Sequence, residues 1–173
     1  MTHAETRKSN VLFLCTHNAA RSILAEAILN DIGGERFVAF SAGSQPAGQP
    51  NPFALELLAL HGTNTSDLRS KSWDEFAQPG APAIDFVFTV CDNAADETCP
   101  IWPGHPAKAH WGVPDPSQTK GTPDDIRRAF LRTYVQLRTR IEFLVDLQLD
   151  KLDPAAAYGE LQSMGDALRA KGE

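Results

Sequence analysis

The chain has 173 residues, 42% of them hydrophobic, and a formal net charge of −6 from 22 acidic and 16 basic side chains. This length predicts one globular domain with a sizeable core. No lysine or arginine cluster stands out, and no apolar run approaches the roughly 20 residues of a membrane span, which argues against nucleic-acid-binding and membrane-spanning proteins. The three cysteines do not suggest an extracellular disulfide framework and the start of the chain has no signal-peptide character, so we expect a cytoplasmic protein.

Short apolar runs recur along the chain and predict strands. Such runs are typical of strands that are buried on both faces of a parallel sheet, and they lie at residues 10–15, 36–43, 84–91 and the start of 107–117. Residues 1–9, before the first run, are polar, and we expect a flexible N-terminal tail there.

Between and after these runs, apolar residues recur at helical spacing. The predicted helices cover residues 20–34, 51–62, 122–149 and a C-terminal helical extension over 151–173. Strands that alternate with helices in this way form βαβ units. We therefore predict a single-domain α/β fold, with a central, mostly parallel four-stranded sheet and helices on both faces, in a domain that spans residues 10–150.

Cys15 directly follows the first predicted strand, and a short loop leads from it into a helix. The residues after the cysteine are Thr16, His17, Asn18, Ala19, Ala20, Arg21 and Ser22. A loop in this position can turn its backbone N–H groups around an oxyanion, and the Arg21 guanidinium can grip two oxygens of a tetrahedral anion. The same positive field is expected to lower the pKa of the Cys15 thiol, and Ser22 to hydrogen-bond the thiolate. We predict an oxyanion-binding loop with Cys15 as its nucleophile.

Simpler interpretations of the cysteines stay open at this point. Cys15 fits a small buried core residue, with Arg21 on the helix surface. Cys91, at the end of the third predicted strand, and Cys99 fit two unrelated thiols or two metal ligands. The spacing of Cys91 and Cys99 is unusual for zinc and no histidine pair supports such a site, so we predict no metal.

With the loop and its flanking elements in view, the sequence resembles the low-molecular-weight protein tyrosine phosphatase family. The resemblance consists of C-x5-R-S after the first strand, "SAG" after the second strand, and the downstream pair Asp115-Pro116. It implies that Asp115 is the general acid that protonates a leaving oxygen. On local sequence alone, the Pro-Asp-Pro stretch favours a surface turn, and only its combination with the loop favours the general acid.

The segment around the other two cysteines is similar to the arsenate reductases related to these phosphatases, in "FTVCDNAADETCP" followed by "HWGVPDP". The resemblance implies that Cys15 attacks arsenate, that Cys91 then forms a disulfide with Cys15, and that Cys99 moves this disulfide outward. Phosphatases of this fold carry aromatic residues after the Asp-Pro pair, whereas Ser117 and Gln118 stand here. That difference speaks against a phosphotyrosine substrate.

The resemblance also implies partners for this chemistry. The substrate is arsenate, with phosphate and sulfate as competing oxyanions, and no cofactor is bound tightly. An external thiol reductant resets the disulfide, and three cysteines favour thioredoxin over glutathione with glutaredoxin or over mycothiol. In some relatives a structural potassium ion is held by residues that match Asn18, Glu26 and Ser41, but the further acidic ligand falls ambiguously near Asp67 or Asp74.

Two rival functions remain at this level. One is a phosphatase that acts on phosphotyrosine or on a small phosphomonoester, which needs Cys15, Arg21 and Asp115 but neither outer cysteine. The other is not an enzyme: an arsenite-binding or redox-sensing protein that uses the three thiols as soft ligands.

Overall fold

The centre of the molecule is a four-stranded parallel sheet. The computed structural model describes residues 7–91, 107–148 and 152–170. The sheet order is β2-β1-β3-β4, and every neighbouring pair is parallel. The strands are β1 (Ser9–Leu14), β2 (Phe37–Ala42), β3 (Phe86–Thr89) and β4 (Ala107–His110).

Four α-helices and two 3-10 helices accompany the sheet in the described part of the chain. They are α1 (Arg21–Ile32), α2 (Pro52–Leu60), η1 (Trp73–Ala77), η2 (Pro116–Gln118), α4 (Pro123–Asp146) and α5 (Pro154–Ala170). The predicted caps are confirmed. The Asn51 side chain accepts a hydrogen bond from Phe53 N at the start of α2, and Thr122 forms a reciprocal capping box with Asp125 at the start of α4.

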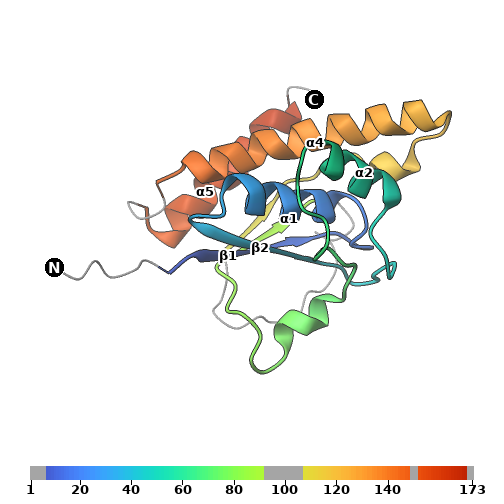
Figure 1. Ribbon diagram of the computed structural model, residues 1–173. Helices are drawn as coiled ribbons and strands as arrows, with labels where there is room; N and C mark the ends of the chain where they lie inside the picture. The colour runs from blue at the N-terminus through green and yellow to red at the C-terminus, as the bar shows by residue number, and fades with distance from the viewer. Residues whose placement is uncertain (1–6, 92–106, 149–151, 171–173) are drawn as a thin grey trace.

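The elements are layered around the sheet. In Figure 1 the four α-helices lie above the sheet, and the segment that carries η1 lies below it. On that lower side Phe76 of η1 makes an edge contact with Phe40 of β2. The largest fully buried side chains come from β1, β2, β3, α1 and α4 and from Trp111 just after β4, and most of them are aliphatic or aromatic. The predicted single-domain α/β fold with a four-stranded parallel sheet is confirmed, and the only described helix on the lower face is the short 3-10 helix η1.

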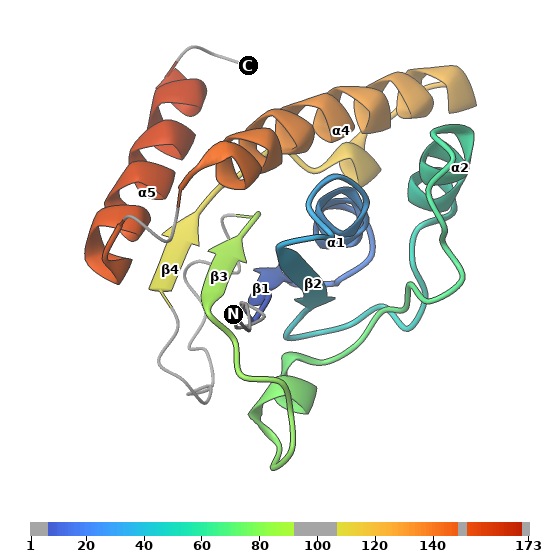
Figure 2. The same cartoon turned by 60° about the vertical axis from the view of Figure 1, so that its left-hand side comes forward.

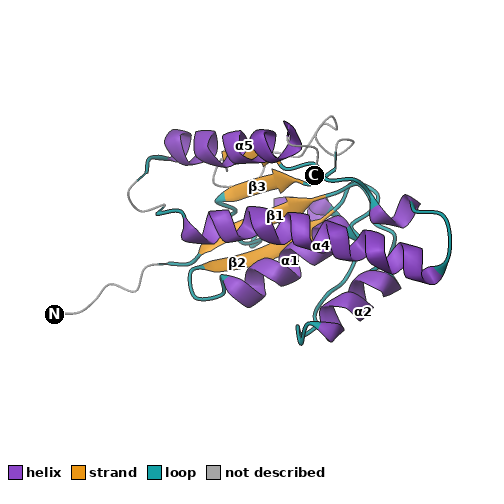
Figure 3. Cartoon of the chain, turned by 90° about the horizontal axis from the view of Figure 1, so that it is seen from above, coloured by secondary structure: helices purple, strands orange, loops and turns teal. Residues whose placement is uncertain are grey.

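The last helix lies apart from the others, on the β4 side of the sheet (Figures 2 and 3). Trp111, just after β4, stacks on Phe88 and donates its indole N–H to Leu161 O of α5 at 2.9 Å. The Gln162 side chain accepts a hydrogen bond from His110 N at 2.9 Å. Helix α5 thus packs against the strand that leads toward Asp115.

This topology brings distant parts of the sequence to one edge. Because parallel strands end at the same edge of a sheet, the loop after β1 meets the segments that follow β3 and β4. None of the described helices has the length and apolar character needed to cross a membrane.

Candidate active site

In the loop between β1 and α1, other segments hydrogen-bond three backbone carbonyls, whereas the amide groups of its second half are left without an acceptor in the described structure. Gln45 N, Ala47 N and Asn51 N donate to the carbonyls of Thr16, His17 and Ala19 respectively, at 2.8–2.9 Å. The amides of residues 17–20 have no acceptor among the described residues, and no side chain caps the N-terminus of α1. Unsatisfied N–H groups at a helix N-terminus favour a bound anion. The predicted oxyanion loop therefore has the geometry of an anion site.

Asn18 fixes the shape of this loop from the inside. Its backbone adopts a left-handed conformation (φ 46°), which asparagine tolerates better than most residues, and its side chain is completely buried. The side-chain amide donates to Ser22 Oγ at 2.8 Å and to Ser41 Oγ at 2.9 Å, and its oxygen accepts from Lys71 N at 2.9 Å. Asn18 therefore ties the loop to α1, to β2 and to the segment before η1. The Ser22 hydroxyl accepts a hydrogen bond from Asn18. The sequence suggested a hydrogen bond from Ser22 to the Cys15 thiolate instead.

Gly43 explains why "SAG" follows the second strand. A Cβ atom at this position would lie 2.4 Å from both Cys15 O and Thr16 O. Backbone oxygens cannot yield as a flexible side chain would, so the loop can pass this close only over a glycine.

Arg21 points from the start of α1 toward the segment after β4. Its terminal nitrogens lie 3.0 Å from Val113 O and 3.4 Å from Asp115 Oδ2. The Nε donor is buried and has no hydrogen-bond partner in the described structure. A buried donor without an acceptor is costly, and an oxyanion in the loop would satisfy it.

Asp115 meets Arg21 because η2 begins immediately after it. Its Oδ1 accepts hydrogen bonds from Ser117 N at 2.9 Å and from Ser117 Oγ at 2.7 Å, which caps η2, while Oδ2 faces Arg21. The side chain keeps 23% of its surface exposed. The carboxyl group thus stands beside Arg21 at the edge of the loop, in contact with solvent.

Cys15 and Cys91 form a buried pair of reduced thiols. Cys91 Sγ accepts a hydrogen bond from Thr16 N at 3.4 Å, and the Cys91 side chain lies against the Cys15 thiol. The contact with Cys91 and burial raise the pKa of Cys15, whereas Arg21 lowers it. The sequence suggested a lowered pKa. The difference arises because a second thiol lies against Cys15 and because the charge of Asp115, which shares Arg21, also raises it.

The structure adds contributors that the motifs did not reveal. The segment just before η1 packs against the loop and against the residue that follows β2. Ser70 Oγ donates to His17 O of the loop at 3.1 Å, and Gly43 N donates to Lys71 O at 3.0 Å. Lys71 is itself buried beside Glu26. Nothing in "LRSKSW" signals this role, because it depends on which segment the fold places behind the loop.

The predicted site residues thus fall into two groups. Cys15, the loop, Arg21, Cys91 and Asp115 come together in space. Cys99 lies outside the described residues. Within the described ranges, no group of three or more His, Cys, Asp or Glu side chains is arranged to hold a metal ion.

Comparisons with known proteins agree with this geometry. A family model described as low molecular weight phosphotyrosine protein phosphatase matches residues 10–153. An arsenate reductase of Shouchella clausii is 33% identical over 135 residues, which cover 78% of this chain and 94% of that protein.

Two solved structures are similar in fold and sequence. A thioredoxin-dependent arsenate reductase of Corynebacterium glutamicum matches with a TM-score of 0.56 and 26% identity, over 80% of this chain and 64% of that one. An arsenate reductase of Archaeoglobus fulgidus matches with a TM-score of 0.62 and 26% identity, over 79% of this chain and 99% of that one.

Proposed function

The chain belongs to the low molecular weight phosphotyrosine protein phosphatase family, and we propose that it reduces arsenate to arsenite with Cys15 as the nucleophile. One observation carries the proposal: a second buried thiol, Cys91, lies against the cysteine of the oxyanion loop. A phosphatase needs one thiol, whereas reduction of As(V) to As(III) takes two electrons. Two thiols supply these electrons when they form one disulfide.

The first step makes a bond between sulfur and arsenic. The Cys15 thiolate attacks arsenate held by the loop amides and Arg21, and Asp115 protonates the oxygen that leaves as water. Because the contact with Cys91 and burial raise the pKa of Cys15, the attack needs a group that takes the thiol proton. An oxyanion that engages Arg21 and the loop brings a proton acceptor next to the thiol, and arsenate itself can take that proton.

The second step transfers the electrons. Cys91 attacks the sulfur of the Cys15 adduct, an S–S bond forms, and the electron pair of the S–As bond leaves with arsenic as arsenite. Cys99 then attacks Cys91, which frees Cys15 and leaves a Cys91–Cys99 disulfide. A dithiol reductant removes that disulfide by thiol–disulfide exchange. We propose thioredoxin as this reductant, since the Corynebacterium glutamicum relative is described as thioredoxin-dependent, and a cytoplasmic location, where thiols stay reduced.

The test is arsenate-dependent oxidation of NADPH in the presence of thioredoxin and thioredoxin reductase. We expect wild-type protein to turn over, and Cys15→Ser, Cys91→Ser and Cys99→Ser each to stop multiple turnover. Cys99→Ser should still release about one equivalent of arsenite and retain a Cys15–Cys91 disulfide, detectable by peptide mapping without reduction. Turnover that needs only Cys15 and requires glutathione with glutaredoxin would contradict both the three-cysteine relay and thioredoxin as the electron donor.

Asp115 has a matched control in the same assay. Asp115→Asn should lower the rate by about 10²–10⁴-fold, the usual contribution of a general acid. Asp124→Asn, on the exposed first turn of α4, should leave it unchanged. If phosphate esters are cleaved while arsenate drives no oxidation with any donor, the protein is a phosphatase and the proposal fails.

A further inference from the structure

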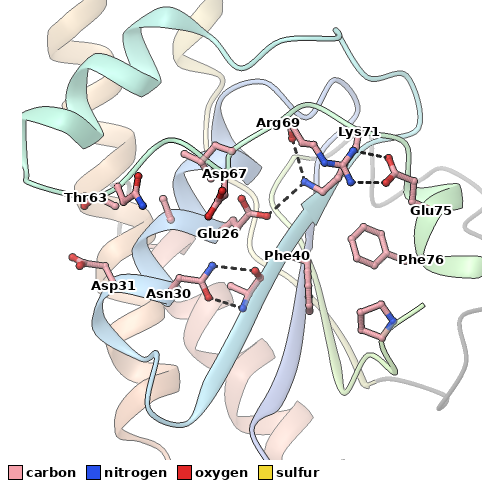
Figure 4. A pocket seen from close by; sticks show the side chains of 15 residues that line it. Glu26, Asn30, Asp31, Phe40, Thr63, Asp67, Arg69, Lys71, Glu75 and Phe76 are labelled. Carbon is pink, nitrogen blue, oxygen red and sulfur yellow. Dashed lines mark hydrogen bonds and ion pairs between the residues drawn. The ribbon is translucent and has the colours of Figure 1, made fainter. Parts of the chain in front are cut away.

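A buried ion pair stands behind the oxyanion loop. Lys71 Nζ lies 3.6 Å from Glu26 Oε1 of α1, and both residues are buried, with 8% and 7% of their surface exposed. The ammonium also donates to Arg69 O at 3.1 Å. Figure 4 shows the pair at the wall of a pocket of about 670 Å³, next to the Arg69–Glu75 ion pair. Two buried charges in this setting stabilise each other and cannot be removed singly without cost.

The pair is connected to the anion site by direct hydrogen bonds. Ser41 Oγ donates to Glu26 Oε1 at 3.4 Å, and Asn18 donates to Ser41 Oγ at 2.9 Å. The backbone of Lys71 completes the circuit, because its N–H donates to Asn18 Oδ1 at 2.9 Å. The Lys71 ammonium is therefore linked through Glu26 and Ser41 to Asn18, the residue that sets the shape of the loop.

The residues around Glu26 do not fit the potassium ion that the family resemblance raised. Asn18, Glu26 and Ser41 are present, but an ammonium already contacts the Glu26 carboxylate and a backbone carbonyl, the kind of oxygens that would ligate the ion. A second cation at this carboxylate would meet the repulsion of the first. Burial raises the pKa of Glu26 and lowers that of Lys71, and each partner opposes the shift of the other, as in a pair that stays charged by mutual contact.

We propose that Lys71 is a positioning residue whose ammonium is a built-in cation beside Glu26, so that the oxyanion loop keeps its shape without a bound potassium ion. The inference rests on the proposed function only in taking a tetrahedral oxyanion as the ligand of the loop. Inorganic phosphate therefore serves as the probe, and its binding does not depend on arsenate reduction.

The experiment measures the phosphate affinity of reduced protein by calorimetry in choline chloride and in potassium chloride at equal ionic strength. Wild-type protein should bind phosphate equally well in both salts. In choline chloride, Lys71→Ala should bind phosphate about tenfold more weakly than wild type, which is the lower end of the loss seen when a residue that orients a binding group is removed. Potassium chloride should restore most of that affinity. Lys8→Ala, an exposed lysine before β1, is the matched control and should behave as wild type.

Three results would overturn the inference. The first is wild-type affinity that rises with potassium, because the loop would then use an external cation. The second is a phosphate affinity of Lys71→Ala in choline chloride that equals that of Lys8→Ala. The third is a Lys71→Ala defect that potassium does not repair, because Lys71 would then act by packing and not by charge.

A variant with both charges removed covers the case in which Lys71→Ala fails to fold. Glu26→Gln with Lys71→Met leaves no unpaired buried charge, and it should bind phosphate weakly in either salt. Wild-type affinity in this double variant would also refute the role of the pair. If phosphate binding follows the expectation but arsenate is not reduced, only the proposed function fails.

Discussion

Gly43 lies where the backbone after β2 passes directly behind the oxyanion loop. Replacing it by alanine would place a Cβ 2.4 Å from two backbone oxygens of the loop, so the loop has to move. We expect Gly43→Ala to destabilise the protein by about 1–3 kcal/mol, the usual cost of overpacking, and to abolish phosphate binding. Urea unfolding and calorimetry check the two effects.

A second glycine offers the control. Gly159 lies within α5, and a Cβ there would meet no atom within 4 Å. Because alanine favours a helix over glycine by about 1 kcal/mol, Gly159→Ala should raise stability slightly and leave phosphate binding unchanged. Equal effects of both substitutions would contradict the close approach at Gly43.

The paired thiols predict how the reactivity of Cys15 depends on pH. The contact with Cys91 is the largest cause that raises the pKa of Cys15, so at a given pH it reduces the thiolate fraction. In Cys91→Ser, alkylation of Cys15 by iodoacetamide should therefore reach half its maximal rate at a lower pH than in wild type. In Arg21→Gln the midpoint should move to higher pH, because Arg21 lowers this pKa.

Mass spectrometry of the peptide that contains Cys15 follows this reaction without interference from the other cysteines. A midpoint that stays in place in both variants would mean that neither neighbour acts on the Cys15 thiol. Shifts in the same direction would be equally incompatible with the opposite signs of the two contributions.

At the scale of elements, α5 has a structural task that the family motifs do not cover. Leu161 is buried, with 1% of its surface exposed, and its carbonyl accepts the indole hydrogen bond of Trp111. Leu161→Ala should lower the free energy of unfolding by about 2–5 kcal/mol, as for other buried leucines. Leu60→Ala, at a side chain that is 77% exposed at the end of α2, should change it by less than about 0.5 kcal/mol.

Denaturant titration of both leucine variants makes the comparison. Equal stabilities would show that α5 adds nothing to the fold. A loss confined to Leu161→Ala would mean that α5 holds the Trp111 segment, from which the chain continues to Val113 and Asp115.

For the molecule as a whole, the anion site predicts stabilisation by simple oxyanions. A ligand that binds only the folded state at 100 times its dissociation constant adds about 2.7 kcal/mol. For a chain of this size that corresponds to a rise in Tm of roughly 5–10 °C. Inorganic phosphate should produce this rise in wild type and not in Arg21→Gln, because the variant lacks the charged guanidinium that binds two oxygens of the anion.

Differential scanning calorimetry in matched chloride and phosphate buffers makes the measurement. Since the chain carries a net charge of −6, a non-specific effect of ionic strength would appear in both proteins alike. Equal shifts in wild type and in Arg21→Gln would therefore argue against a specific site.

Much of the molecule follows from the sequence itself. Continuous apolar runs and helix caps such as Asn51 and Thr122 predict the elements, because burial and capping act through neighbouring residues. The order of strand, Cys15, loop and Arg21 predicts an anion site for the same reason, since the loop and the start of α1 are contiguous in the chain.

Only the tertiary structure decided how distant segments act on that loop. The loop alone predicts a lowered pKa for Cys15, whereas the contact with Cys91 raises it. Asp115 reaches Arg21 because β4 ends at the same edge of the sheet, and Lys71 stands beside Glu26 because the fold lays the segment before η1 behind the loop. These interactions join residues that are 45 to 94 positions apart, and no local pattern encodes which of them become neighbours once the core is formed.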